Sequence, residues 1–151
     1  MTADPYAPPQ ARLDRTALDQ ELPQGIRWMV MSGVAAAAIT CAINIYGLMG
    51  AIVVIRNVGA RLQPVYLAYD LCHMLVVAGL AYGTYRGSRT CAVLAFVTSI
   101  LTHGIGIMLS RGAMAIAWVL AVALIGGYLI GMIGTLRWHA WRASRAASTA
   151  A

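Results

Sequence analysis

Apolar residues along the chain gather into four long runs separated by short polar segments. The runs cover residues 28–55, 64–85, 91–109 and 113–136. A helix that crosses a bilayer needs about 20 apolar residues, so each run predicts a membrane-spanning helix. The first run is longer than the bilayer requires. We expect this helix, whose span ends at about residue 52, to tilt, to bend near 44–47, or to continue past the membrane surface.

The connections between the runs are short and cover residues 56–63, 86–90 and 110–112. Short connections place consecutive helices side by side and antiparallel. The pattern therefore predicts an all-α fold, an integral membrane four-helix up-down-up-down bundle over residues 26–139. Residues 1–25 are expected to form a flexible N-terminal tail, and residues 140–151 a disordered C-terminal tail.

The arginines predict how the bundle is oriented. Eight of the eleven basic residues would lie at one end of the bundle, namely Arg12, Arg15, Arg27, Arg86, Arg89, Arg137, Arg142 and Arg145. Basic residues near the ends of spans favour the cytoplasmic side. Trp28, Tyr85, Trp138 and Trp141 fall at this end too, as interfacial aromatic rings do. We expect a multi-pass protein of a bacterial inner (plasma) membrane with both termini in the cytoplasm.

Composition narrows the classes of protein. Hydrophobic residues make up 60% of the chain and charged residues 11%, against roughly 45–50% and 25% in soluble domains. A soluble domain, a disordered chain and a disulfide scaffold are all disfavoured. The net charge of +6 comes from arginines at the ends of the runs rather than from one patch, so nucleic acid is not an expected partner. The three cysteines lie inside apolar runs without C-x-x-C spacing, as small buried hydrophobic residues do.

Polar residues inside the runs are the candidate ligand-binding residues, because polar groups are costly in hydrocarbon. They are Asn44, Tyr66, Asp70, His73 and His103. Asp70 is the one acidic residue within a run, and His73 lies one helical turn away. The pair predicts either a hydrogen-bonded contact that fixes helix register or a site for a proton or ligand, and the sequence leaves both open.

His73 and His103 are expected at the same depth in the membrane, because each lies 15 residues from the turn centred on residue 88. Two histidines level with each other in a bundle can ligate a b-type haem through Nε2. They can also flank a quinone or bind a metal ion. Two histidines also lie at the same depth by chance in such bundles. The first expectation is therefore that the protein binds no cofactor and no metal, and the alternative is that it binds haem b.

Glycines form small-residue faces on two of the predicted helices. Gly79 and Gly83 have G-x-x-x-G spacing in the second run, and Gly127, Gly131 and Gly134 line one side of the fourth. Such faces let helices approach closely. We therefore assign these glycines to helix packing.

Two short motifs in the chain resemble those of a known group of proteins. The stretches Gly131–His139, which contains G-T-x-x-x-H, and Tyr85–Ala92, with its Ser-Arg pair, resemble a group of uncharacterised small four-helix bacterial inner-membrane proteins. Ile133 stands where that group has an arginine. The resemblance implies the fold and the location but no activity, and it implies that His139 is an interface histidine near the end of the last helix.

No nucleophile elbow, H-E-x-x-H motif or phosphate-binding loop is present, so an enzyme is not expected. The leading hypothesis is a small non-enzymatic membrane protein that acts as an accessory or interaction subunit. Its expected partners are the lipid bilayer, other membrane subunits or a second copy in a homodimer. The alternatives are an electron-transfer subunit that uses His73 and His103, and a small proton-coupled transporter that uses Asp70.

Overall fold

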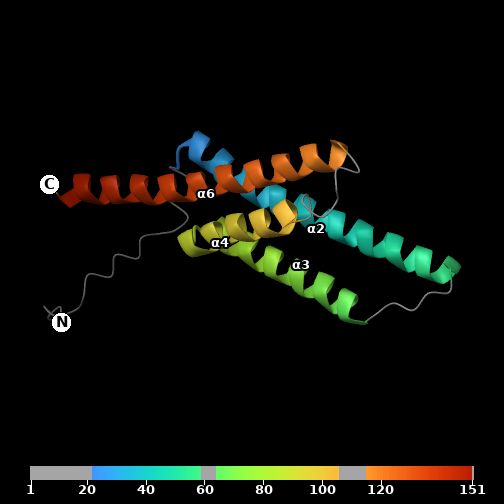
Figure 1. Cartoon of the computed structure of the whole chain (residues 1–151). Helices are drawn as coiled ribbons and strands as arrows, with labels where there is room; N and C mark the ends of the chain where they lie inside the picture. Colours follow the sequence, from blue (N-terminus) through green and yellow to red (C-terminus); the bar gives the residue numbers. More distant parts are fainter. Residues whose placement is uncertain (1–21, 59–63, 106–114, 151) are drawn as a thin grey trace, which may run out of the picture.

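The computed structural model describes residues 22–58, 64–105 and 115–150, and within these ranges the chain is helical except at residues 22–23 and in the turn at 86–88. The elements are α2 (Gln24–Val58), α3 (Pro64–Tyr85), α4 (Arg89–Ser99), the π-helical segment η1 (Ile100–Gly104) and α6 (Ala115–Ala150), as Figure 1 shows. The predicted all-α class is confirmed.

Three of the helices are long and apolar enough to cross a membrane. The candidate spans are Gln24–Asn57, Leu67–Tyr85 and Ala117–Arg145. The third predicted run, 91–109, falls on α4 and η1, and its last residues, 106–109, lie outside the described residues. The spanning of that segment stays a prediction.

Helices α2 and α6 are longer than the sequence analysis expected. α2 is one α-helix of 35 residues that passes through 44–47 without interruption. At 1.5 Å per residue it is about 52 Å long, well beyond the roughly 30 Å of hydrocarbon in a bilayer. α6 continues to Ala150, through the segment expected to be disordered. Alanine and arginine are among the best helix formers, which is why this segment rich in both is helical rather than disordered.

The helices form a ring of contacts in the order α2, α6, α4 and α3. α2 packs on α6 and α3, and α4 packs on the same two helices from the other side. Figure 1 shows α2 crossing α6, with α4 lying along α3. The centre of the bundle is therefore lined by all four helices.

Alanines make up half of the core cluster, and many large apolar side chains point outward. The core cluster consists of Ala36, Ala37, Val77, Ala95, Leu124 and Tyr128. On the outside, Tyr46 is 81% exposed, Leu75 73% and Val119 71%. A soluble protein buries its large aliphatic and aromatic side chains, so this distribution is the reverse of a soluble fold.

Glycines bring α2 and α6 into backbone contact. A Cβ atom at Gly131 would lie 2.6 Å from the Cα of Gly33, and one at Gly127 would lie 2.9 Å from the Cβ of Ala36. Gly134 likewise faces Met29 and Val30 of α2. The face formed by Gly127, Gly131 and Gly134 therefore packs on α2.

The two glycines of α3 differ from each other. Gly83 packs against Cys91 of α4, whereas Gly79 has no neighbour within 4 Å among the described residues. Of these two glycines, therefore, Gly83 packs between helices, and Gly79 faces open space among the described residues.

Candidate functional site

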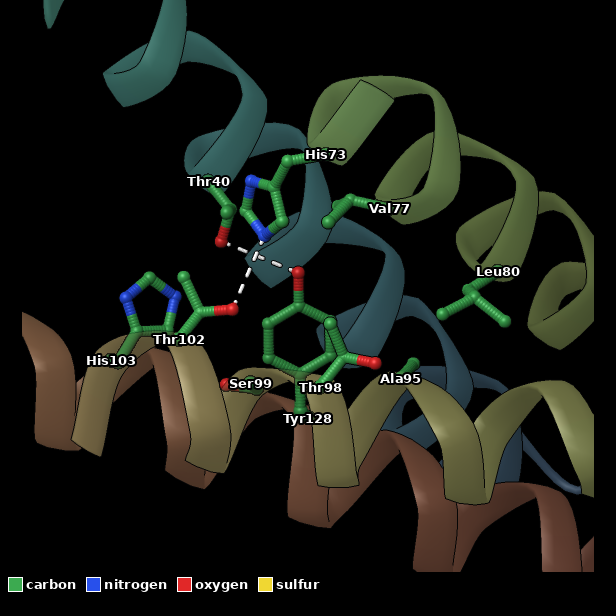
Figure 2. Close-up of a pocket in the computed structure, with 10 residues that line it drawn as sticks. All are labelled: Thr40, His73, Val77, Leu80, Ala95, Thr98, Ser99, Thr102, His103 and Tyr128. Atoms are coloured by element: carbon green, nitrogen blue, oxygen red, sulfur yellow. Dashed lines mark hydrogen bonds between the residues drawn. The ribbon is translucent and has the colours of Figure 1, made fainter. Parts of the chain in front are cut away.

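A small polar cavity lies at the centre of the bundle (Figure 2). All four helices and η1 contribute to its lining, which consists of Thr40, His73, Val77, Leu80, Ala95, Thr98, Ser99, Thr102, His103 and Tyr128. Its free volume is about 10 Å³, which is about the least that holds one water molecule.

His73 of α3 is held by hydrogen bonds to two other helical segments. The side-chain amide of Asn44 lies 3.3 Å from His73 Nδ1, and Thr102 Oγ1 lies 3.3 Å from His73 Nε2. Asn44 Nδ2 also donates to the Thr40 carbonyl at 3.0 Å, which fixes the orientation of the amide. Asn44 therefore donates to Nδ1, and His73 donates from Nε2 to the Thr102 hydroxyl. This network requires the Nε2–H tautomer of His73.

Asp70 is not part of this network. Its side chain is half-buried on α3 and does not line the cavity. The hydrogen bonds of His73 run to Asn44 and Thr102, so the structure does not show the predicted contact between Asp70 and His73. The ring next to His73 is that of Tyr69, stacked within 2° of parallel at 6.2 Å between centroids. Tyr66 lies in the first turn of α3, and its side chain lies outside the described residues.

A further hydrogen bond connects α6 to α2 beside the cavity. The Tyr128 hydroxyl donates to Thr40 Oγ1 at 3.3 Å, and Thr40 donates to the Ala36 carbonyl at 2.9 Å. Neither Tyr128 nor Thr102 was predicted from the sequence as a site residue. A signal for Tyr128 existed, because it is the one tyrosine in the fourth run and a buried phenol generally needs a hydrogen-bond partner.

The segment that carries Thr102 and His103 is π-helical. A π-helical turn contains more residues than an α-helical turn, so it changes which side chains face inward, and such turns occur frequently at functional sites. Here Thr102 and His103 are adjacent in sequence, yet both line the cavity, and they do so together with Ser99 of the preceding turn.

Ser99 gives the cavity an unused hydrogen-bonding group. Its side chain is 4% exposed, and its hydroxyl has no partner among the described residues. Buried polar groups are nearly always paired with protein or with ordered water. The hydroxyl, the two imidazoles and the small volume together fit a polar species the size of a water molecule.

The structure brings His73 and His103 together at one cavity, as their equal depth predicts. The closed bundle does not fit a haem, because the free volume is about 10 Å³ and both nitrogens of His73 are hydrogen-bonded. No group of three metal-binding side chains occurs among the described residues. Cys72, expected to be buried, is exposed on α3, and the described cysteines are free thiols.

His139 contacts the α3–α4 turn instead of ending its helix. Its Nε2 donates to the Gly87 carbonyl at 2.6 Å, and α6 continues for another eleven residues to Ala150.

Comparison of the chain with known protein families, with curated proteins and with solved structures gives no match.

Proposed function

We propose that this chain is a non-enzymatic integral protein of a bacterial inner membrane, an up-down-up-down four-helix bundle that serves as an accessory or interaction subunit. One observation carries the proposal: alanines and closely packed glycines join the helices, while many large apolar side chains point outward. Lipid tails are as apolar as leucine, so helices in a bilayer associate through close packing of small residues. The contact between Gly33 and Gly131 is of this kind.

Cysteine labelling tests the membrane insertion and its orientation. The native cysteines are replaced by alanine, and single cysteines are introduced as Asn57→Cys and Thr90→Cys, at exposed positions near opposite ends of α3. We expect a membrane-impermeant maleimide to label Asn57→Cys in intact spheroplasts, and Thr90→Cys only after lysis. Labelling of Thr90→Cys alone in intact spheroplasts would reverse the orientation, and equal labelling of both would overturn the bundle topology.

An exposed stripe on α2 supports the role of an interaction subunit. Tyr46, Met49 and Val53 are 81%, 62% and 57% exposed and lie three and four residues apart, on one face of the helix. A photo-crosslinking amino acid at Tyr46 tests whether protein covers this face, with Leu75 of α3 as the control position. We expect a discrete adduct from position 46, either one recurring membrane protein or a second copy of this 16.0 kDa chain. Lipid adducts alone at both positions would contradict the proposal.

A second candidate function rests on the cavity, because His73 and His103 both line it. An electron-transfer role with a b-type haem requires α3 and η1 to move apart and His73 to release Asn44 and Thr102. An absorption spectrum of oxidised and dithionite-reduced protein, purified with haem supply intact, tests this role. We expect no haem band. A band that is lost in both His73→Ala and His103→Ala would establish the electron-transfer role.

Proton-coupled transport through Asp70 is the remaining alternative. Asp70 lies one turn from His73 but outside the hydrogen-bonded network, so we rank this function below the other two. Retention of a measured transport activity in Asp70→Asn would remove it, whereas loss of that activity with unchanged expression would favour it.

A further inference from the structure

Tyr46 of α2 and Asp70 of α3 have no polar partner among the described residues. Tyr46 is 81% exposed, and its hydroxyl makes no hydrogen bond with them. Asp70 is half-buried and forms neither a hydrogen bond nor an ion pair with them. A phenol or a carboxyl group is costly in hydrocarbon unless it is paired, and lipid tails offer neither donor nor acceptor. Both side chains therefore point to a partner that another protein molecule supplies.

Tyr46 and Asp70 lie at nearly the same depth in the proposed bilayer. The hydrogen bond between Asn44 and His73 shows that these two residues are level with each other on α2 and α3. The two helices run in opposite directions (Figure 1). Tyr46 is two residues beyond Asn44 toward the end of α2. Asp70 is three residues before His73, toward the same end of the bundle. At 1.5 Å per residue, the two depths differ by about 1.5 Å.

The surface of α2 around Tyr46 is open. None of the described side chains in residues 45–57 is buried, and nothing lies within 4 Å of Gly47. The cation described near this end of α2 is Arg56, twelve residues beyond Asn44. It therefore lies about 14 Å further out along the helix axis than Asp70, which explains why the two form no ion pair. A second protein molecule has access to this face.

We propose that two copies of this chain form a homodimer in which Tyr46 of each copy donates a hydrogen bond to Asp70 of the other. The proposal rests on the membrane insertion and interaction role proposed above. Copies inserted in the same orientation are related by a two-fold axis along the membrane normal, which keeps every residue at its own depth. A contact between two different residues then occurs twice, and it requires that both lie at one depth, as Tyr46 and Asp70 do. A phenol donates and a carboxylate accepts, so this surface is complementary to itself.

Thiol cross-linking between two differently tagged copies tests the contact directly. The native cysteines are replaced by alanine, one copy carries Tyr46→Cys and the other Asp70→Cys, so the second Tyr46–Asp70 pair of the dimer stays intact. We expect a short bifunctional thiol reagent to join the two tags in membranes. In the control, Leu75→Cys replaces Asp70→Cys. Leu75 is 73% exposed and lies about 140° around α3 from Asp70, so it should give little product. Equal product from both pairs would overturn the defined interface.

Dissociation of the dimer in lipid vesicles measures what the contact contributes. Förster energy transfer between labelled full-length chains is followed as the protein is diluted in lipid. Tyr46→Phe and Asp70→Leu should each weaken association roughly tenfold, because each removes two hydrogen bonds between helices in a membrane. The double variant should be no weaker than the weaker single variant, because both changes remove the same bonds. Tyr85→Phe, 57% exposed near the other end of α3, should associate as the parent protein does.

Three results of this measurement would overturn the dimer. They are a monomer at every protein-to-lipid ratio, unchanged association in both single variants when circular dichroism shows them folded, and fully additive losses in the double variant. Photo-crosslinking at position 46 separates failure of the dimer from failure of the proposed function. An adduct with a different membrane protein would overturn the homodimer and leave the interaction role, whereas lipid adducts alone would overturn both.

Discussion

Gly33 of α2 and Gly131 of α6 meet backbone to backbone. A Cβ atom at Gly33 would lie 2.9 Å from the Cα of Gly131, and one at Gly131 would lie 2.6 Å from the Cα of Gly33. These two helices form the most extensive helix–helix contact in the bundle. Their crossing places Thr40 beside Tyr128, so the glycine contact also positions the polar cavity.

Gly131→Ala should therefore destabilise the bundle, because the new methyl group meets backbone that cannot move away without separating α2 from α6. We expect a loss of about 1–3 kcal/mol in the free energy of unfolding, as for overpacked cores. Gly126→Ala is the matched control, since nothing lies within 4 Å of that position. It should gain up to about 1 kcal/mol from helix propensity. Unfolding in mixed micelles of mild detergent and SDS, followed by circular dichroism, measures both. Equal stability of the two variants would contradict the close crossing.

Thr102→Val should lower stability and disturb the imidazole of His73, because it removes the acceptor of the Nε2 proton. Hydrogen bonds between helices in membranes contribute about 0.6 kcal/mol on average and up to about 1.7, and we expect a loss in that range. Thr102→Ser keeps the hydroxyl and should behave as the parent. The ¹⁵N chemical shifts of His73 report the tautomer, and Nε2–H should predominate in the parent protein. An Nδ1–H tautomer there would refute the assigned network.

Ser99→Ala tests whether the cavity holds a polar species. A hydroxyl that is truly unpaired when buried costs about 1–3 kcal/mol, so its removal would stabilise the protein. We instead expect Ser99→Ala to lower the free energy of unfolding by about 0.6–1.7 kcal/mol, because the hydroxyl contacts a bound water-sized molecule. Thr98→Ala, on the same helix and also lining the cavity, is the comparison. A clear gain in stability for Ser99→Ala would show that the cavity is dry.

Much of the fold follows from apolar run length alone. The run at 64–85 coincides with α3 because Pro64 begins the helix and the Schellman turn at Gly87 ends it. The C-terminal end is different: the stretch after Arg142 contains no apolar run, yet it is helical to Ala150. Pairs four residues apart, Trp138 with Arg142 and Trp141 with Arg145, stabilise a helix in a polar segment. A hydropathy pattern does not detect such pairs, so it does not predict this part of the helix.

The site was only partly predictable. Equal distance from the turn suffices to bring His73 and His103 to one level. Their partners depend on features that a single sequence does not reveal, because the π-helical segment changes the inward face at Thr102. The packing of α2 against α3 brings Asn44, and not Asp70, within hydrogen-bonding distance of His73. An acidic residue in a span is a candidate site residue because a carboxylate is costly in lipid. Its position on the helix nevertheless decides whether it joins the hydrogen bonds around His73.

Gly87→Ala should loosen the contact between the α3–α4 turn and α6. A residue other than glycine in the left-handed region costs about 1–2 kcal/mol, and the methyl group would overlap the Trp138 ring. The hydrogen bond from His139 to the Gly87 carbonyl should weaken as the turn moves away. We expect faster amide hydrogen exchange around residues 84–92 and in α6 after residue 134, with little change near Thr40. Gly25→Ala, which has no neighbour within 4 Å, is the control. Unchanged exchange in Gly87→Ala would mean that Trp138 is not packed on the turn.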